Sequence, residues 1–303
     1  MRKSLKEKLS AMLPAEALKK VYSSFDIIGD IGIIKTAGAS QEEARVVANQ
    51  ILSIHKNLKT VLTQTSAIKK GYRTRELRLL AGENKTTTTY KESGCTFQVD
   101  VEKCYFSPRL SHERARITKQ VQSGETVVNM FAGVGCFSII IAKTVPQTTV
   151  YSIDINPAAF ECMVENVRRN RVYGNVYPFL GDAKHIIETQ LRRVADRVIM
   201  PLPELALRYL PIALLALKPS GGWIHFHDFQ HATAKEDPTE KTKQNVTEKL
   251  GGLNVGYKIA NARVVRSTGP NWWHIVLDIH VEVAEQVLIT QPSPIYPWTH
   301  HEA

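Results

Sequence analysis

The stretch from residue 126 to residue 156, TVVNMFAGVGCFSIIIAKTVPQTTVYSIDIN, restricts the fold more than any other part of the chain. An apolar run is followed by Gly133 and Gly135, by a second apolar run of helical length, and by a β-branched run that ends in Asp154. This order predicts strand, tight turn, helix and strand, which is half of a nucleotide-binding α/β sheet. Glycines let a backbone approach a ligand closely, and the acid 21 residues after Gly133 suits the hydroxyls of a ribose.

The third glycine of the dinucleotide-binding pattern is absent, because Ser138 stands in its place. For the loop taken alone, an ordinary tight turn is the plain alternative. The missing glycine and the layout of the remaining chain favour S-adenosylmethionine over NAD. Five strand–helix units followed by an antiparallel hairpin describe the seven-stranded sheet of class I S-adenosylmethionine-dependent methyltransferases, whereas a NAD-binding fold more typically ends in another parallel unit. The sequence favours S-adenosylmethionine as cofactor, with S-adenosylhomocysteine as product.

The elements of this α/β part are predicted from apolar periodicity. The predicted strands are 126–132, 149–154, 175–180, 195–200 and 222–229, the predicted helices are 137–144, 157–170, 183–191, 204–217 and 236–250, and the closing hairpin is 257–267 with 272–282. The tail QPSPIYPWTHHEA is rich in proline and is expected on the surface.

Length and composition are those of a folded two-domain protein, with 303 residues, 43% hydrophobic and 22% charged. The longest apolar runs are about ten residues, too short for a membrane helix. The N-terminus lacks the apolar core of a signal peptide, so we expect a cytoplasmic protein. The four cysteines form no CxxC pair, which predicts buried, reduced thiols and neither a metal site nor a disulfide framework.

The net charge of +10 is unevenly distributed. Residues 1–104 carry 18 Lys and Arg against 11 Asp and Glu, whereas residues 105–303 carry 21 against 18. This difference favours a polyanion as partner of the first part, with a solvated basic surface as the alternative.

Residues 1–104 read as a small α+β domain and residues 105–303 as the catalytic domain. The elements predicted for the first domain are a helix over 3–20 interrupted at Pro14, a strand–turn–strand over 22–35, a helix over 40–56 with a Ser40–Glu43 capping box, a strand at 59–64 and a hairpin over 87–101 that turns at Ser93-Gly94. Ser111 is predicted to cap the helix that follows the domain junction.

Several motifs beyond the glycine loop belong together. They are VYSSFDIIGDIGIIK at 21–35, HKNLKTVL at 55–62, YRTRELRLLAGE at 72–83, GCTFQVDVEKCYFSPRLSHER at 94–114, NMFAGVGCFSI at 129–139, DINP at 154–157, GDA at 181–183 and DRVIMPLPE at 196–204. In these segments the chain resembles the archaeal and eukaryotic tRNA (guanine-37-N1)-methyltransferases. That family has a further N-terminal domain, which we expect to be absent or reduced here because the motifs of the second domain begin at once.

The resemblance implies transfer of a methyl group from S-adenosylmethionine to N1 of the guanosine at position 37 of tRNA. It implies that Glu113 is the base that removes the N1 proton and that Arg73 stabilises the charge on O6 or holds the guanine, with Arg75 as a nearby competitor. A water-facing glutamate and a surface arginine are the plain alternatives for the first two residues. No obligate protein partner is indicated.

The resemblance also implies a set of cofactor-binding residues. Phe131, Gly133 and Gly135 would lie under the methionine part, Asp154 would take the ribose hydroxyls, Ile155 and Asn156 would lie beside the adenine, Asp182 and Ala183 would meet the adenine amino group, and Tyr105, Arg114 and Pro201 would complete the pocket. For Asp182, capping of the following helix is an alternative that is compatible with this role.

One segment departs from the family pattern. The family usually has Asn-Leu-Pro after the fourth strand, where this chain has Met200-Pro201-Leu202-Pro203. Pro201 offers no side-chain or backbone donor. Aminocarboxypropyl transfer, methylation of a wyosine intermediate at the same position, and a tRNA-binding protein that has lost catalysis therefore stay open as alternatives.

Overall fold

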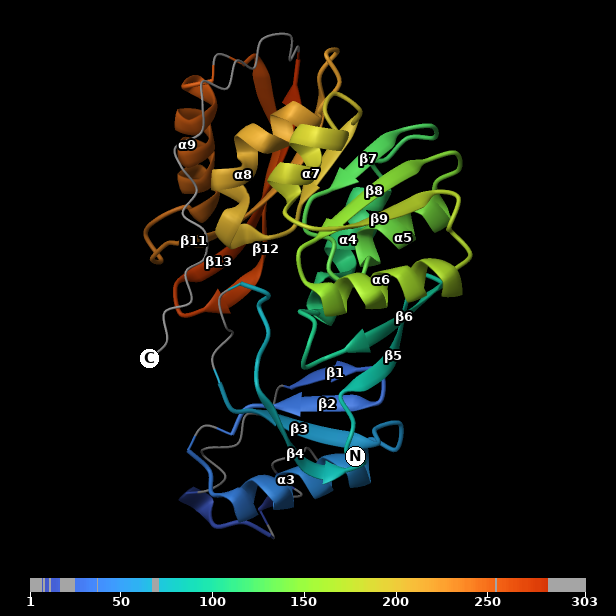
Figure 1. The fold of residues 1–303 in the computed structure, drawn as a ribbon. Coiled ribbons are helices and arrows are strands. Elements are labelled where there is room, and N and C mark those ends of the chain that lie inside the picture. Colours follow the sequence, from blue (N-terminus) through green and yellow to red (C-terminus); the bar gives the residue numbers. More distant parts are fainter. Residues whose placement is uncertain are drawn as a thin grey trace, which may run out of the picture. The chain divides into compact units, whose positions relative to one another are not determined.

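The computed structural model describes residues 7, 9–10, 12–16, 25–36, 38–66, 71–253 and 255–282. Figure 1 shows the ribbon. The chain divides into two compact units, one of Met1–Glu125 with Phe131–Ala183 and the other of Thr126–Met130 with Lys184–Ala303. The predicted helix over 3–20 lies mostly outside the described residues, and the tail at 291–303 lies wholly outside them.

The first unit begins with a four-stranded sheet packed against one helix (Figure 1). Its elements are β1 (Asp26–Ile28), β2 (Ile31–Ile34), α3 (Gln41–Ile54), β3 (Thr60–Gln64) and β4 (Leu77–Gly82). β2 runs parallel to β3, and the other two neighbouring pairs are antiparallel. The predicted strand–turn–strand, helix and strand are all confirmed.

Local signals set the position of α3. The Glu43 amide donates to Ser40 Oγ at 3.1 Å, and the Ser40 amide donates to Glu43 Oε2 at 2.7 Å, which confirms the capping box. The buried face of the helix carries Ala44, Val47 and Ile51. Their spacing is that of one helical face, so the apolar contact with the sheet follows from the sequence alone.

A separate hairpin follows, made of β5 (Thr87–Glu92) and β6 (Cys95–Asp100). Its turn residues Ser93 and Gly94 have φ values of 50° and 72°. Two successive positive φ values are those of the tight turn that matches the twist of a two-residue hairpin. The predicted hairpin and its turn are confirmed.

The helix at the predicted domain junction begins differently from expectation. A short 3₁₀ turn, η1 (Pro108–Leu110), leads directly into α4 (Ser111–Thr118). Ser111 is already helical and donates its amide to the Pro108 carbonyl. The prediction that Ser111 caps this helix is wrong, because the preceding turn supplies the first hydrogen bonds in place of a side chain.

The remaining strands form a seven-stranded sheet in the order β12-β13-β11-β10-β7-β8-β9. The strands are β7 (Thr126–Asn129), β8 (Thr149–Asp154), β9 (Val176–Leu180), β10 (Arg197–Met200), β11 (Gly222–His231), β12 (Tyr257–Gly269) and β13 (Trp272–Val281). β10 is parallel to β7 and β11, β8 is parallel to β9, and β13 is antiparallel to β11 and β12. This order, with its closing antiparallel hairpin, confirms the predicted class I methyltransferase fold.

The helices of this part are α5 (Cys136–Thr144), α6 (Pro157–Arg169), α7 (Ala183–Gln190), α8 (Pro203–Ala216) and α9 (Pro238–Gly251). Each lies within a few residues of its predicted range. β7 ends three residues early, because the chain leaves the strand at Met130 to enter the glycine turn.

The four cysteines are all buried and free, as predicted. Within the described residues, no helix is long and apolar enough to cross a membrane.

Candidate active site

The turn that leads into α5 is built on two glycines with left-handed backbone. Gly133 has φ 57°, and Gly135, which precedes the first helical residue, has φ 90°. Side chains are disfavoured in this conformation, so glycine is required at both positions. A Cβ added to Gly133 would meet only the Tyr105 carbonyl oxygen within 4 Å, at 3.8 Å. The backbone at Gly133 is therefore open to a ligand. Ser138, in place of the third glycine, is buried in the first turn of α5.

Asp154, the last residue of β8, holds this loop. Its Oδ2 accepts the Gly133 amide at 2.6 Å, and its Oδ1 accepts the Asn156 amide at 2.9 Å. Burial raises the pKa of Asp154, and the two backbone amides partly oppose that rise. A carboxylate has about four acceptor positions, so Asp154 keeps capacity for the two hydroxyls of a ribose.

The residues after Asp154 divide between binding and support. The Ile155 side chain is 44% exposed, an unusual place for isoleucine, and is suited to an adenine ring. Asn156 is buried and its amide is used internally: Oδ1 accepts the Ala158 amide at 3.0 Å, and Nδ2 donates to the Lys103 carbonyl at 2.7 Å. Asn156 therefore starts α6 and anchors the segment that precedes Tyr105.

The other predicted cofactor residues lie near these elements in the chain. Phe131 lies two residues before Gly133, and Asp182 lies two residues after the end of β9, directly before the first residue of α7, Ala183. That position of Asp182 is compatible with both predicted roles. Pro201 follows β10 in the second unit, and its contact with the cofactor stays a prediction.

Glu113, the predicted base, lies in the first turn of α4 and is only 1% exposed. Its carboxylate pairs with Arg116 one turn later: Arg116 Nη2 lies 2.7 Å from Oε1, and Arg116 Nε lies 3.0 Å from both oxygens. A water-facing glutamate is therefore excluded. Two-point pairing fixes the orientation of the carboxylate, which a positioned base requires.

Arg114, the next residue of α4, is also buried. Its Nε and Nη2 donate to the two carboxylate oxygens of Glu92 at 2.7 and 2.5 Å, and Nη1 and Nη2 lie 3.3 Å from the Ser107 carbonyl oxygen. Burial lowers the pKa of Arg114, but the hydrogen bonds and the charge of Glu92 raise it by more, so that the pKa lies above its usual value. The guanidinium thus ties α4 to the last residue of β5, and its contact with the cofactor stays a prediction.

The structure brings Arg73 onto Tyr105. The guanidinium carbon lies 3.8 Å from the centroid of the Tyr105 ring, a cation–π contact. Arg73 has φ 57°, which is uncommon for a residue with a side chain. Burial lowers the pKa of its competitor Arg75, and the nearby Asp26 partly opposes that change. Two residues that the sequence assigned to base recognition and to the pocket are therefore neighbours.

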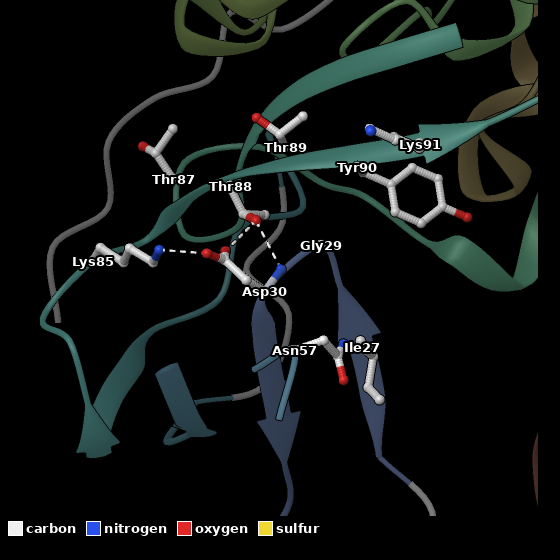
Figure 2. Close-up of a pocket in the computed structure, with 10 residues that line it drawn as sticks. All are labelled: Ile27, Gly29, Asp30, Asn57, Lys85, Thr87, Thr88, Thr89, Tyr90 and Lys91. Carbon is white, nitrogen blue, oxygen red and sulfur yellow. Dashed lines mark hydrogen bonds and ion pairs between the residues drawn. The ribbon is translucent and has the colours of Figure 1, made fainter. Parts of the chain in front are cut away.

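A polar groove of about 740 Å³ lies elsewhere in the first unit (Figure 2). In it Thr88 Oγ1 donates to Asp30 Oδ1 at 2.6 Å, and Lys85 Nζ lies 2.6 Å from Asp30 Oδ2. Gly29 has φ 56°, and a Cβ there would lie 2.2 Å from Thr88 Oγ1. These contacts attach the β1–β2 turn to β5. None of the predicted site residues lines the groove.

Sequence reasoning missed Glu92, Arg116, Asn166 and Asn170. Glu92 and Arg116 look like ordinary surface charges in the sequence. The two asparagines carry a signal that was available: Asn166 falls on the buried face of α6 with Met163 and Val167, and Asn170 continues that face at the C-cap, four residues later. Polar residues on the apolar face of a helix need hydrogen-bond partners when buried.

Comparison with known proteins identifies the family of this chain. The model of the TRM5/TYW2 methyltransferase domain matches residues 88–253, and that of the TYW2 N-terminal domain matches residues 5–86. The chain belongs to the TRM5/TYW2 methyltransferase family. The predicted resemblance is confirmed, and the hairpin β5–β6 falls within the part that matches the TRM5/TYW2 methyltransferase domain.

The names of similar proteins within the family give different reactions. Trm5b of Pyrococcus abyssi, a tRNA (guanine(37)-N(1))-methyltransferase, is 39% identical over 89% of this chain and 78% of its own length. Taw21 of Saccharolobus solfataricus, a tRNA 4-demethylwyosine(37)-methyltransferase, is 38% identical over 86% of this chain and 94% of its own length. A tRNA(Phe) (4-demethylwyosine(37)-C(7)) aminocarboxypropyltransferase of Methanocaldococcus jannaschii is 34% identical over 84% and 96%.

Solved structures agree with this assignment. Trm5b from Pyrococcus abyssi superposes with a TM-score of 0.80 at 38% identity, covering 89% of this chain and 79% of that one. A complex of aTrm5 with tRNALeu gives 0.79 at 32% identity, covering 92% and 79%. TYW2 of M. jannaschii in complex with AdoMet gives 0.61 at 28% identity, covering 86% and 100%. The predicted S-adenosylmethionine-dependent methyltransferase is confirmed at the level of fold, family and cofactor.

Proposed function

We propose that this protein transfers a methyl group from S-adenosylmethionine to N1 of guanosine 37 of tRNA. The observation that carries the proposal is the buried, oriented carboxylate of Glu113 in the same compact unit as the glycine loop and Asp154. Burying a carboxylate costs free energy, and a role in catalysis gives a reason for keeping one at 1% exposure beside Arg116.

The reaction needs a base because N1 of neutral guanine carries a proton. Glu113 takes that proton, and Arg73, held against Tyr105, donates hydrogen bonds to O6 as negative charge develops there. The glycine loop, Asp154 and Ile155 hold the cofactor, which supplies the methyl group when bound. Arg114 keeps α4 in place through Glu92.

Methylation of 4-demethylwyosine at the same position is the second candidate. Two observations favour it: the similarity to Taw21 extends over 94% of that relative at nearly the same identity as to Trm5b, and Pro201 lacks the side-chain amide of the asparagine that the family usually has at this place. Aminocarboxypropyl transfer is supported by the weaker similarity to the M. jannaschii enzyme.

The deciding experiment measures transfer of labelled methyl groups to tRNA transcripts that differ only at position 37. We expect label on the guanosine transcript and none on the adenosine transcript. Transfer only to tRNA carrying 4-demethylwyosine would establish the second candidate in place of the first. A cofactor labelled instead in its aminocarboxypropyl chain detects the third reaction, and absence of all three with cofactor bound would leave a tRNA-binding protein.

Binding of tRNA should weaken steeply with added salt. The first 104 residues hold a net excess of seven positive charges, and each phosphate contact releases counterions. For about four phosphate contacts we expect affinity to fall at least tenfold between 50 and 200 mM salt. Filter binding measures this, with S-adenosylhomocysteine affinity over the same range as the control. A salt-independent tRNA affinity would remove the basic domain from the tRNA-binding surface.

A further inference from the structure

α6 lies beside β6 (Figure 1). Two asparagines pair with the edge of the hairpin β5–β6: Asn166 of α6 and Asn170, the residue with helical backbone that caps the C-terminal end of α6. Asn166 Oδ1 accepts the Gln98 amide at 2.6 Å, and Asn166 Nδ2 donates to the Gln98 carbonyl at 3.0 Å. Likewise, Asn170 Oδ1 accepts the Thr96 amide at 2.8 Å, and Asn170 Nδ2 donates to the Thr96 carbonyl at 2.7 Å. Both asparagines are buried. Each side-chain amide thus accepts one backbone N–H and donates to one backbone carbonyl of β6, as the backbone of a neighbouring strand would.

The spacing of the two elements makes this pairing possible. Thr96 and Gln98 are two residues apart on β6, a distance of about 6.6 Å along a strand. Asn166 and Asn170 are four residues apart on α6, about 6.0 Å along a helix. The near match lets two successive helical turns satisfy two successive outward-facing strand residues. An edge that would otherwise expose its backbone groups is covered.

The remaining hydrogen bond distinguishes the two asparagines. Asn170 Nδ2 donates to the carbonyl of Asn166, within its own helix, at 2.7 Å. Asn166 Nδ2 donates instead to the Val134 carbonyl at 3.0 Å. Val134 is the residue between the two left-handed glycines of the cofactor loop. Asn166 alone of the pair therefore contacts that loop.

The hairpin that Asn166 holds also leads to the helix of the predicted base. Glu92 at the end of β5 accepts hydrogen bonds from Arg114 with both carboxylate oxygens, and Arg114 directly follows Glu113 in α4. One side chain thus contacts the loop that carries the cofactor and the hairpin that fixes α4. A shift of either element is transmitted to the other through Asn166.

We propose that Asn166 is a positioning residue that sets the cofactor loop relative to the helix of Glu113. Its side chain is fully buried and acts through the Val134 carbonyl and the backbone of Gln98. The part of the proposal that concerns Glu113 rests on the proposed function, whereas the part that concerns the loop depends only on cofactor binding.

The test compares Asn166→Leu with Asn170→Leu. Leucine has the same number and branching of side-chain heavy atoms as asparagine and no hydrogen-bonding group. Each variant loses two contacts to β6, with Gln98 or with Thr96. Only the first variant also loses the contact to Val134, whereas the second loses the contact to the Asn166 carbonyl. We expect the dissociation constant for S-adenosylhomocysteine, measured by calorimetry, to rise at least tenfold in Asn166→Leu and less than twofold in Asn170→Leu. Hydrogen exchange of a peptide covering residues 130–136 should accelerate only in the Asn166 variant.

Equal effects of the two substitutions on affinity and on loop exchange would overturn the proposal and leave both asparagines as structural residues. If the leucine variants fail to fold, Asn166→Ser and Asn170→Ser form a milder matched pair in which water can replace the amide, and the same difference is expected. If guanosine 37 is not methylated but the difference in S-adenosylhomocysteine affinity persists, the proposed function fails and the role of Asn166 at the loop stands.

Discussion

Glu113→Gln should slow single-turnover methyl transfer by about 10²- to 10⁴-fold, the contribution typical of a positioned general base. Glutamine keeps the shape of the side chain and one oxygen for Arg116, but it cannot take the N1 proton. Affinities for S-adenosylhomocysteine and tRNA should stay within about twofold, because the carboxylate acts on the proton and not on binding. Rapid-quench measurement at saturating cofactor isolates the chemical step.

α6 offers a matched control. Glu165 pairs with Arg168 three residues later, as Glu113 pairs with Arg116, but Arg168 is 78% exposed and the pair lies on the surface. Glu165→Gln should leave turnover and binding unchanged, since exposed pairs contribute little. The Glu113 substitution breaks a buried pair, so its unfolding midpoint must be measured to separate lost catalysis from lost folding. A folded Glu113→Gln protein with normal turnover would end the assignment of Glu113 as base.

Asp154→Asn should weaken S-adenosylhomocysteine binding by about 100-fold, equivalent to about 3 kcal/mol. The carboxylate accepts the Gly133 and Asn156 amides and is predicted to accept the ribose hydroxyls as well. Asparagine offers one oxygen, and its NH₂ group would face one of those amides, so both the loop and the ligand lose acceptors. Calorimetric titration measures the change. Asp237→Asn is the control, because Asp237 caps α9 in the second unit.

The pH dependence of the unchanged protein tests the same residue. Burial raises the pKa of Asp154, with the amides of Asn156 and Gly133 opposing it. Cofactor affinity should therefore fall as pH drops through that raised pKa. A raised folded-state pKa has the opposite effect on the apo fold: its contribution to stability is present below the unfolded pKa and is lost as pH rises through the folded one. An Asp154→Asn protein that binds as tightly as the original, with the same pH profile, would remove Asp154 from the site.

Much of the fold could be predicted because its signals are local. The capping box of α3, the Ser93-Gly94 turn and the glycine loop each depend on a few neighbouring residues. The error at Ser111 has the same origin: a serine before an apolar run is a common cap, but the 3₁₀ turn at Pro108 made a side-chain cap unnecessary. The contacts of the candidate site were harder to predict, since Arg114 pairs with Glu92 and Arg73 lies on Tyr105, which belong to other segments of the chain.

The sequence by itself determined the order of strands and helices, the class of the sheet, and the presence of glycines followed by an acid. These follow from periodicity and backbone preference, which act over a few residues. Only the tertiary structure decided that Glu113 is buried and paired with Arg116. It also decided that Arg73 lies on the ring of Tyr105 and that Arg114 pairs with Glu92. It also decided that Asn166 joins the cofactor loop to the hairpin. Such contacts depend on which surfaces become buried together, and burial decides whether a charged or amide side chain faces water or must find a partner.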